Sequence, residues 1–219
     1  MFDPIPIDEF LARVRLAVLP HTTGECSEVV SLRQLASIES VQPMRRDYLR
    51  AVMCAVPLAD GRGDVYKHAR ITTLRVDPHA VRLGQTFVER SKYQQFLEGF
   101  EASFGAFCVA RGMAKLGACI AYGKTQTGVS AIAHYVPPIV ECGPSGWVLL
   151  DGVHRMYLAK QIGTTLETVI VEPVTARFPT DLHEWDQVRV VNTKPPREER
   201  YNNLRPELFR NLKYVGLDG

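Results

Sequence analysis

The chain has 219 residues, of which 46% are hydrophobic and 23% are charged, so its composition is that of a globular protein and not of a disordered one. A chain of this length buries roughly 70% of its extended surface on folding, so it needs neither a metal ion nor disulfides to fold. The formal net charge of +2 is too balanced to predict nucleic-acid binding from charge alone.

The N-terminal third predicts two short helices followed by a hairpin. Asp8 is a candidate cap for a helix from Glu9 to about Val18, and Ser31 to Ile38 has apolar residues at helical spacing. Tyr48 to Leu58 and Val65 to Val76 are predicted to be extended and to be joined by a glycine-containing turn.

The middle of the chain predicts further helices. Residues 91–104 carry aromatic side chains at helical spacing, which is typical of the core face of an amphipathic helix. Ala106 to Tyr122 is nearly all apolar and predicts a buried helix, and Gly123 to Ser130 predicts a polar loop.

A strand–turn–strand–helix–strand unit is predicted next. Ile139 to Glu141 and Trp147 to Leu150 are short strands joined by a Gly-Pro-Ser-Gly turn. Val153 to Ile162 is a helix that ends at the following glycine, and Thr168 to Val174 is a strand. A last helix is expected at Leu204 to Leu212.

Taken together, these elements predict a mixed α/β fold with a small central sheet. The expected organisation is an N-terminal extension over residues 1–64, a nucleotide-binding domain over 65–175 with an insertion near 105–130, and a C-terminal appendage over 176–219. In this appendage Lys194, Arg197 and Arg200 alternate with glutamates, which indicates a solvated tail, with phosphate or nucleic-acid contact as the alternative.

Cysteine usage and the N-terminus indicate the cytoplasm. The five cysteines form no Cys-x-x-Cys pair, which argues against a zinc ribbon and a dithiol redox motif. The residues after Met1 lack a basic region followed by an apolar run, so we expect no signal peptide. No stretch of about 18 uncharged apolar residues predicts a membrane span.

One segment, Asp151-Gly152-Val153-His154-Arg155, carries a candidate site between a predicted strand and a predicted helix. The first turn of a helix has unpaired N–H groups and a partial positive charge, so it favours an anion. Gly152 lacks a Cβ and lets a phosphate approach the backbone, while His154 and Arg155 add donors. Basic residues at this end oppose the helix dipole, and a bound anion would remove that conflict. Residues 152–155 therefore predict a phosphate site.

The chain resembles the ParB/sulfiredoxin superfamily over about residues 71–174. The resemblance lies in a strand, an Asp-Gly-x-His-Arg turn and a helix, which follow a Pro-Ile strand and a turn. The resemblance implies a small mixed sheet with flanking helices and a helix start that grips the phosphates of ATP, ADP or CTP. Sulfiredoxins place a catalytic cysteine where this chain has Val153, so sulfinic acid reduction is not expected. ParB proteins continue into a helix-turn-helix DNA domain, for which the residues after Val174 leave little room.

The branch with Asp-Gly-x-His-Arg includes free serine kinases. In that branch a glutamate after the first strand acts as general base, and the resemblance gives this role to Glu89. It also implies that Asp151 organises the reacting groups and holds Mg²⁺, and that His154 takes part in the chemistry. A carboxylate that takes the hydroxyl proton while cations hold the phosphoryl group is sound phosphotransfer chemistry. The insertion near 105–130 departs from this branch and leaves the acceptor open.

Two further sequence patterns lie outside the Asp151–Arg155 segment. Ala118 to Thr125 fits a relaxed P-loop pattern but is too bulky for a glycine-rich arc, so a Walker site is not favoured. Lys124 and Thr125 are nevertheless candidates to reach the phosphates from the insertion. His134 and Tyr135 are interpreted as a packed pair at a strand edge, with a catalytic role as the alternative.

We therefore expect a cytoplasmic, Mg²⁺-assisted kinase that uses ATP or ADP on a small hydroxyl-bearing metabolite, such as a free amino acid. The alternatives are a ParB-like DNA-associated nuclease, a nucleotide-switched binding protein, and a nucleotide sensor without catalysis. The near-neutral charge does not encourage a nucleic-acid partner, and no membrane partner is expected. The sequence does not indicate an oligomeric state.

Overall fold

The computed structural model describes residues 2–19, 25–92 and 115–216, and in this part the fold is mixed α/β, as predicted. Contacts along the chain separate two units. The first comprises Met1–Ala69, Gly117–Val136 and Arg210–Gly219, and the second Arg70–Leu116 and Pro137–Phe209. This division differs from the predicted extension, nucleotide domain and appendage, because residues from the predicted insertion form strands of the first unit.

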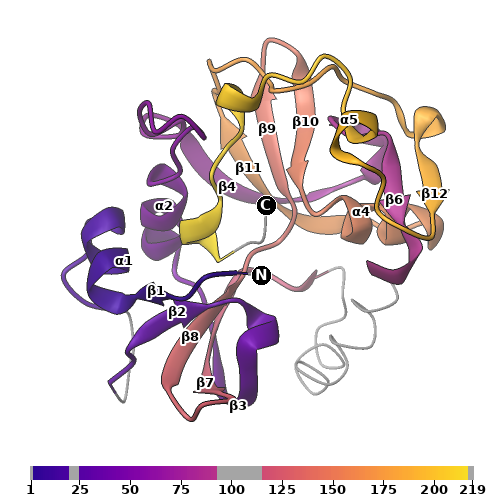
Figure 1. The fold of residues 1–219 in the computed structure, drawn as a ribbon. Coiled ribbons are helices and arrows are strands. Elements are labelled where there is room, and N and C mark those ends of the chain that lie inside the picture. Colours follow the sequence, from indigo (N-terminus) through magenta and orange to yellow (C-terminus); the bar gives the residue numbers. More distant parts are fainter. Residues whose placement is uncertain (1, 20–24, 93–114, 217–219) are drawn as a thin grey trace. The chain divides into compact units, whose positions relative to one another are not determined.

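The first unit contains a five-stranded sheet in the order β1-β2-β8-β7-β3 (Figure 1). The strands are β1 (Ile5–Pro6), β2 (Glu28–Val30), β3 (Leu35–Pro43), β7 (Cys119–Thr125) and β8 (Ser130–Tyr135). β2 runs parallel to β8, and the other neighbours are antiparallel. Gly123 of β7 faces an irregularity of β3, where a Cβ would lie 1.9 Å from the Ser37 carbonyl oxygen, so this contact requires a glycine.

Two helices belong to this unit, α1 (Ile7–Val14) and α2 (Arg46–Cys54), together with 3-10 turns at Leu32–Gln34 and Lys213–Val215. α1 buries Phe10 and Val14, and it ends at Arg15, which has a φ of 58°. The predicted helix therefore exists but is shorter at its C-terminal end.

The predicted hairpin in this region is wrong. α2 occupies most of the stretch predicted as its first strand, and its buried residues are Tyr48, Leu49, Val52 and Met53. Positions i, i+1, i+4 and i+5 lie on one face of a helix, and that periodicity was hidden by the high apolar content of the segment. The helix predicted at Ser31 to Ile38 is also wrong beyond its first turn, because β3 begins at Leu35.

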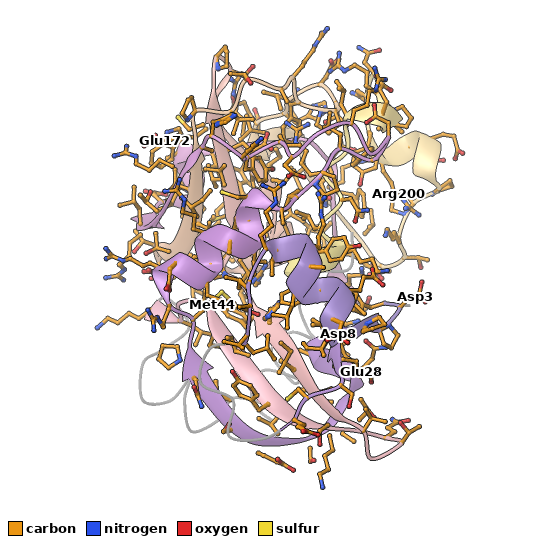
Figure 2. All side chains as sticks on the ribbon, turned by 90° about the vertical axis from the view of Figure 1, so that its left-hand side faces the viewer. Asp3, Asp8, Glu28, Met44, Glu172 and Arg200 are labelled. Atoms are coloured by element: carbon orange, nitrogen blue, oxygen red, sulfur yellow. The ribbon has the colours of Figure 1, made fainter. Side chains whose placement is uncertain are left out.

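The second unit contains a five-stranded sheet in the order β4-β11-β9-β10-β5. The strands are β4 (Arg70–Val76), β5 (Arg82–Leu83), β9 (Ile139–Gly143), β10 (Gly146–Asp151) and β11 (Leu166–Glu172). β11 is parallel to β9 and antiparallel to β4, where an ion pair joins Arg70 to Glu172 (Figure 2). β10 is antiparallel to β9 and parallel to β5.

Helix α4 (Val153–Gln161) packs on this sheet through its buried residues Met156 and Ala159. These join a core cluster that includes Leu83, Val140 and Ile170. The same cluster is covered by the chain's two tryptophans, which are Trp147 and Trp185.

A separate two-stranded parallel ribbon pairs β6 (Phe87–Glu89) with β12 (Arg189–Val191). The chain turns helical at Arg90, directly after β6. β12 leads toward the short helix α5 (Arg197–Arg200), and 3-10 turns lie at Pro78–Ala80, Trp185–Gln187 and Pro206–Leu208.

Most predictions for the second unit are confirmed. β9, the following turn, β10, α4 and β11 lie where the sequence predicted them. The helix predicted at Leu204 to Leu212 is reduced to a single 3-10 turn. The buried helix predicted over Ala106 to Tyr122 is wrong at its C-terminal end, because strand β7 begins at Cys119. Its earlier residues, and the aromatic helix beyond Lys92, lie outside the described residues.

Within the ranges that the structure describes, every helix is too short or too polar to cross a bilayer.

Candidate functional site

The predicted phosphate corner is a strand–glycine–helix junction in the second unit. β10 ends at Asp151, and α4 begins at Val153 with Gly152 as its N-cap, at φ 89° and ψ 24°. A Cβ on Gly152 would lie 2.8 Å from Pro138 Cβ and 2.9 Å from Pro138 Cα, so both the backbone angle and the packing require glycine. No side chain caps this helix end, and its first turn carries no acidic residue.

Glu89 and His154, which are 65 positions apart, meet at this corner. The Glu89 backbone N–H donates a hydrogen bond to His154 Nε2 over 3.1 Å. The Glu89 carboxylate accepts a hydrogen bond of 2.8 Å from the Ser91 hydroxyl at Oε1, which fixes the orientation of the carboxylate. The candidate base therefore lies at the end of β6, beside the first turn of α4.

His154 is held in its neutral form. Burial first, and then the positive charges of Lys92, Arg155 and Lys194, lower the pKa of its imidazole to about 4 against the opposing effect of Glu89. Because Nε2 accepts the Glu89 N–H, the ring proton is assigned to Nδ1. His154 therefore does not supply the cationic charge that the sequence interpretation gave it.

Arg155 has a local partner. Its Nη2 forms an ion pair of 2.9 Å with Asp151 Oδ2, one helical turn earlier in the sequence. The two side chains are 12% and 25% exposed, so water only partly screens the pair. This pair neutralises the charge that Arg155 would otherwise bring to a phosphate.

The excess positive charge near the corner comes from elsewhere. Lys92 follows β6, Lys194 follows β12 and Arg200 ends α5, and the charges of all three influence this region. The sequence interpretation placed Lys194 and Arg200 in a solvated tail. The apolar Val190-Val191 pair is the sequence signal for β12, the strand that precedes them, but its partner strand is not visible in the sequence.

Lys124 and Thr125 belong to the first unit, whereas the corner belongs to the second. Both end strand β7; Lys124 Nζ lies 4.0 Å from Glu39 Oε1, and the Thr125 hydroxyl bonds to Thr127 at 2.9 Å. A strand that enters a hairpin has no place for the helix that follows a P-loop lysine. Their role at the phosphates stays a prediction, and no step proposed below uses them.

His134 is a core residue of the first unit. It is 2% exposed on β8, and its Nε2 lies 2.8 Å from the Tyr48 hydroxyl. Burial lowers its pKa to about 4, so the ring is neutral near pH 7. The packed interpretation of this histidine therefore agrees with its position in the structure.

The residues present do not form a magnesium centre by themselves. Asp151 directs Oδ2 to Arg155, and no group of three or more His, Cys, Asp or Glu with metal-binding geometry exists in the parts of the chain that the structure describes. Magnesium usually binds proteins through one or two carboxylates and the substrate's own phosphates. Its binding by Asp151 stays a prediction, and no step is derived through it.

A cavity of about 190 Å³ lies at the other end of β9 and β10, lined by Glu141, the 143–146 turn and residues 174–178. None of the five motif residues contributes to its lining. The corner at Gly152 is therefore a separate feature of the second unit.

Comparison of the chain with family models, curated proteins and solved structures gave no match.

Proposed function

We propose that this protein is a nucleotide-dependent phosphotransferase that uses ATP or ADP to phosphorylate a small hydroxyl-bearing metabolite, such as the free amino acid serine. The observation that carries the proposal is the 3.1 Å contact between the Glu89 backbone and His154. It places Glu89 beside an uncapped helix start, close enough for its carboxylate charge to act on His154. A carboxylate near an anion site is the combination that phosphoryl transfer to a hydroxyl needs. As part of this proposal, the protein acts in the cytoplasm, where its nucleotide is abundant.

In the proposed reaction the phosphate chain lies at the first turn of α4, whose N-terminal end no side chain caps. The acceptor hydroxyl passes its proton to the Glu89 carboxylate, whose Oε1 is oriented by Ser91. The acceptor oxygen then forms a bond to the terminal phosphorus, and the bond from that phosphorus to the bridging oxygen breaks. The nucleotide leaves with one phosphate fewer, and Glu89 releases its proton to water.

His154 positions the base in this scheme. Its neutral Nε2 holds the Glu89 backbone in place, and burial keeps the ring neutral near pH 7. The Arg155–Asp151 pair fixes the turn between β10 and α4 without adding net charge.

The test incubates the purified protein with ATP or ADP and a panel of hydroxyl-bearing metabolites, serine first, and measures nucleotide turnover. Glu89→Gln should keep nucleotide affinity within about twofold and lower turnover by roughly 10²-fold to 10⁴-fold, the usual contribution of a general base. Glu167→Gln, on β11 of the same unit, is the matched control and should leave turnover unchanged.

Four outcomes are informative. Full turnover by Glu89→Gln would contradict the assignment of the base. Nucleotide binding without turnover on any acceptor would favour a nucleotide sensor. Salt-sensitive DNA binding would favour a DNA-associated protein. Absence of any melting shift with ATP, ADP and CTP would contradict the nucleotide site itself, because a ligand that binds the folded state raises the melting temperature.

A further inference from the structure

Three cations of the second unit are linked by their charges, and we call them the basic cluster: Lys92, Lys194 and Arg200. Lys92 and Lys194 act on His154 at the start of α4, and Arg200 acts on Lys194. The β6–β12 ribbon explains how two of them meet. These strands are parallel, with Glu89 opposite Val191, so their carboxyl ends lie at the same edge. Lys92 and Lys194 each follow the last paired residue of their strand by three positions. Ligands commonly bind at this edge of parallel strands.

Arg200 is added to the cluster by α5. Its Nε donates a hydrogen bond of 2.6 Å to the carbonyl oxygen of Pro195, the residue next to Lys194. This bond holds the guanidinium beside the residue that follows Lys194. Elements that are more than 100 positions apart thus contribute to one positive region.

The cations of the basic cluster repel one another, because the charges of Lys92 and Arg200 both act against the charge of Lys194. The carboxylate of Glu89 opposes this effect, and Glu198 and Glu199 precede Arg200 on α5. Burial first, and then the charges of Lys92 and Arg200, lower the pKa of Lys194, and Glu89 only partly opposes them. A lowered lysine pKa means that the folded protein disfavours the charged side chain. An anion bound among these side chains would favour the charged form of Lys194.

We propose that Lys194 and Arg200 bind the phosphate chain of a nucleoside di- or triphosphate together with Lys92, so that the segment from Lys194 to Arg200 is part of the site. The inference rests on the proposed nucleotide site and names the residues that supply its positive charge. A chain of two or three phosphates is favoured because it carries enough negative charge to neutralise the cluster while it also occupies the start of α4. A monophosphate presents less charge to the same groups.

Calorimetric titration with ATP, ADP and AMP tests this proposal. Lys194→Gln should weaken ATP and ADP binding about tenfold or more, which is the usual effect of losing one charge-assisted contact. AMP binding should change less. Lys194→Arg keeps the charge and should restore binding to within about threefold. Arg189→Gln, at the opposite end of the same strand, removes an exposed charge and should leave affinity within about twofold.

A second readout separates ligand binding from a structural role. Lys194→Gln removes repulsion from the ligand-free protein, so its urea midpoint should equal or exceed that of the wild type while its ATP affinity falls. A structural lysine would lower both. Equal ATP affinity of Lys194→Gln and Arg189→Gln would overturn the inference and leave the proposed function standing. Failure of the wild type to bind ATP, ADP or CTP would overturn both.

Discussion

Replacement of Gly152 by alanine should destabilise the second unit far more than the same replacement at Gly163. Both glycines flank α4 and have positive φ, 89° and 67°. A left-handed conformation costs a non-glycine residue about 1–2 kcal/mol, so both variants carry this term. Only Gly152 faces a neighbour, because its new Cβ would lie 2.8–2.9 Å from Pro138, whereas nothing lies within 4 Å at Gly163.

The contact with Pro138 sets the difference. Its ring cannot rotate away, and one of the atoms approached is its Cα, so the backbone itself must shift. Overpacking of this kind typically costs about 1–3 kcal/mol. We therefore expect Gly152→Ala to lower the free energy of unfolding by about 2–5 kcal/mol and Gly163→Ala by about 1–2 kcal/mol.

Urea unfolding followed by tryptophan fluorescence measures this difference. Trp147 and Trp185 both pack on the core of the second unit, so the signal reports that unit. Equal losses in the two variants would refute the packing argument, since the backbone term alone would then explain both. At a temperature where Gly152→Ala remains folded, it should also lose the melting shift given by ATP, whereas Gly163→Ala should keep it.

Two further predictions concern protonation and pairing. The folded pKa values of His134 and His154, both about 4, lie below the unfolded value near 6.5, so the unfolded state binds more protons between these limits. The stabilisation is therefore present above pH 6.5 and lost as the pH falls toward 4, by about 3 kcal/mol for His134 and, after screening, about 2 kcal/mol for His154. NMR titration should show both rings neutral at pH 6, and a ring that titrates near 6.5 would contradict its burial. A double-mutant cycle with Asp151→Asn and Arg155→Gln should give a coupling of about 1–2 kcal/mol in urea unfolding, and a coupling near zero would show that their 2.9 Å contact is not energetically significant.

The sequence predicted best where local signals agree. The turn between β9 and β10, the glycine before α4 and the glycine after it each mark an element boundary that needs no distant partner. Prediction failed where a continuous apolar run was compatible with two structures. Cys119 to Tyr122 is buried at every position as a strand inside a sheet, and such a run has no periodicity to separate it from a buried helix.

The candidate site divides in the same way. Gly152 and His154 are two positions apart in sequence, so their motif was visible, and the family resemblance led to Glu89. Lys194 and Arg200 join the site through the pairing of two three-residue strands about 100 positions apart. Such short strands carry little pattern, and parallel pairing leaves no hairpin turn to mark it.

The shape of the candidate site and its positive charge therefore come from different parts of the chain. Gly152 shapes the corner, His154 is neutral, and Arg155 is balanced by Asp151, so the pentapeptide provides geometry with little net charge. The attraction for an anion must then depend on the basic cluster that β6, β12 and α5 assemble. Because attraction between charges acts over longer range than packing, substitutions in the cluster should change nucleotide affinity in a salt-dependent manner. Substitutions in the corner should change affinity through the fold of α4, with little dependence on salt. That contrast is a direct consequence of placing the cations outside the motif.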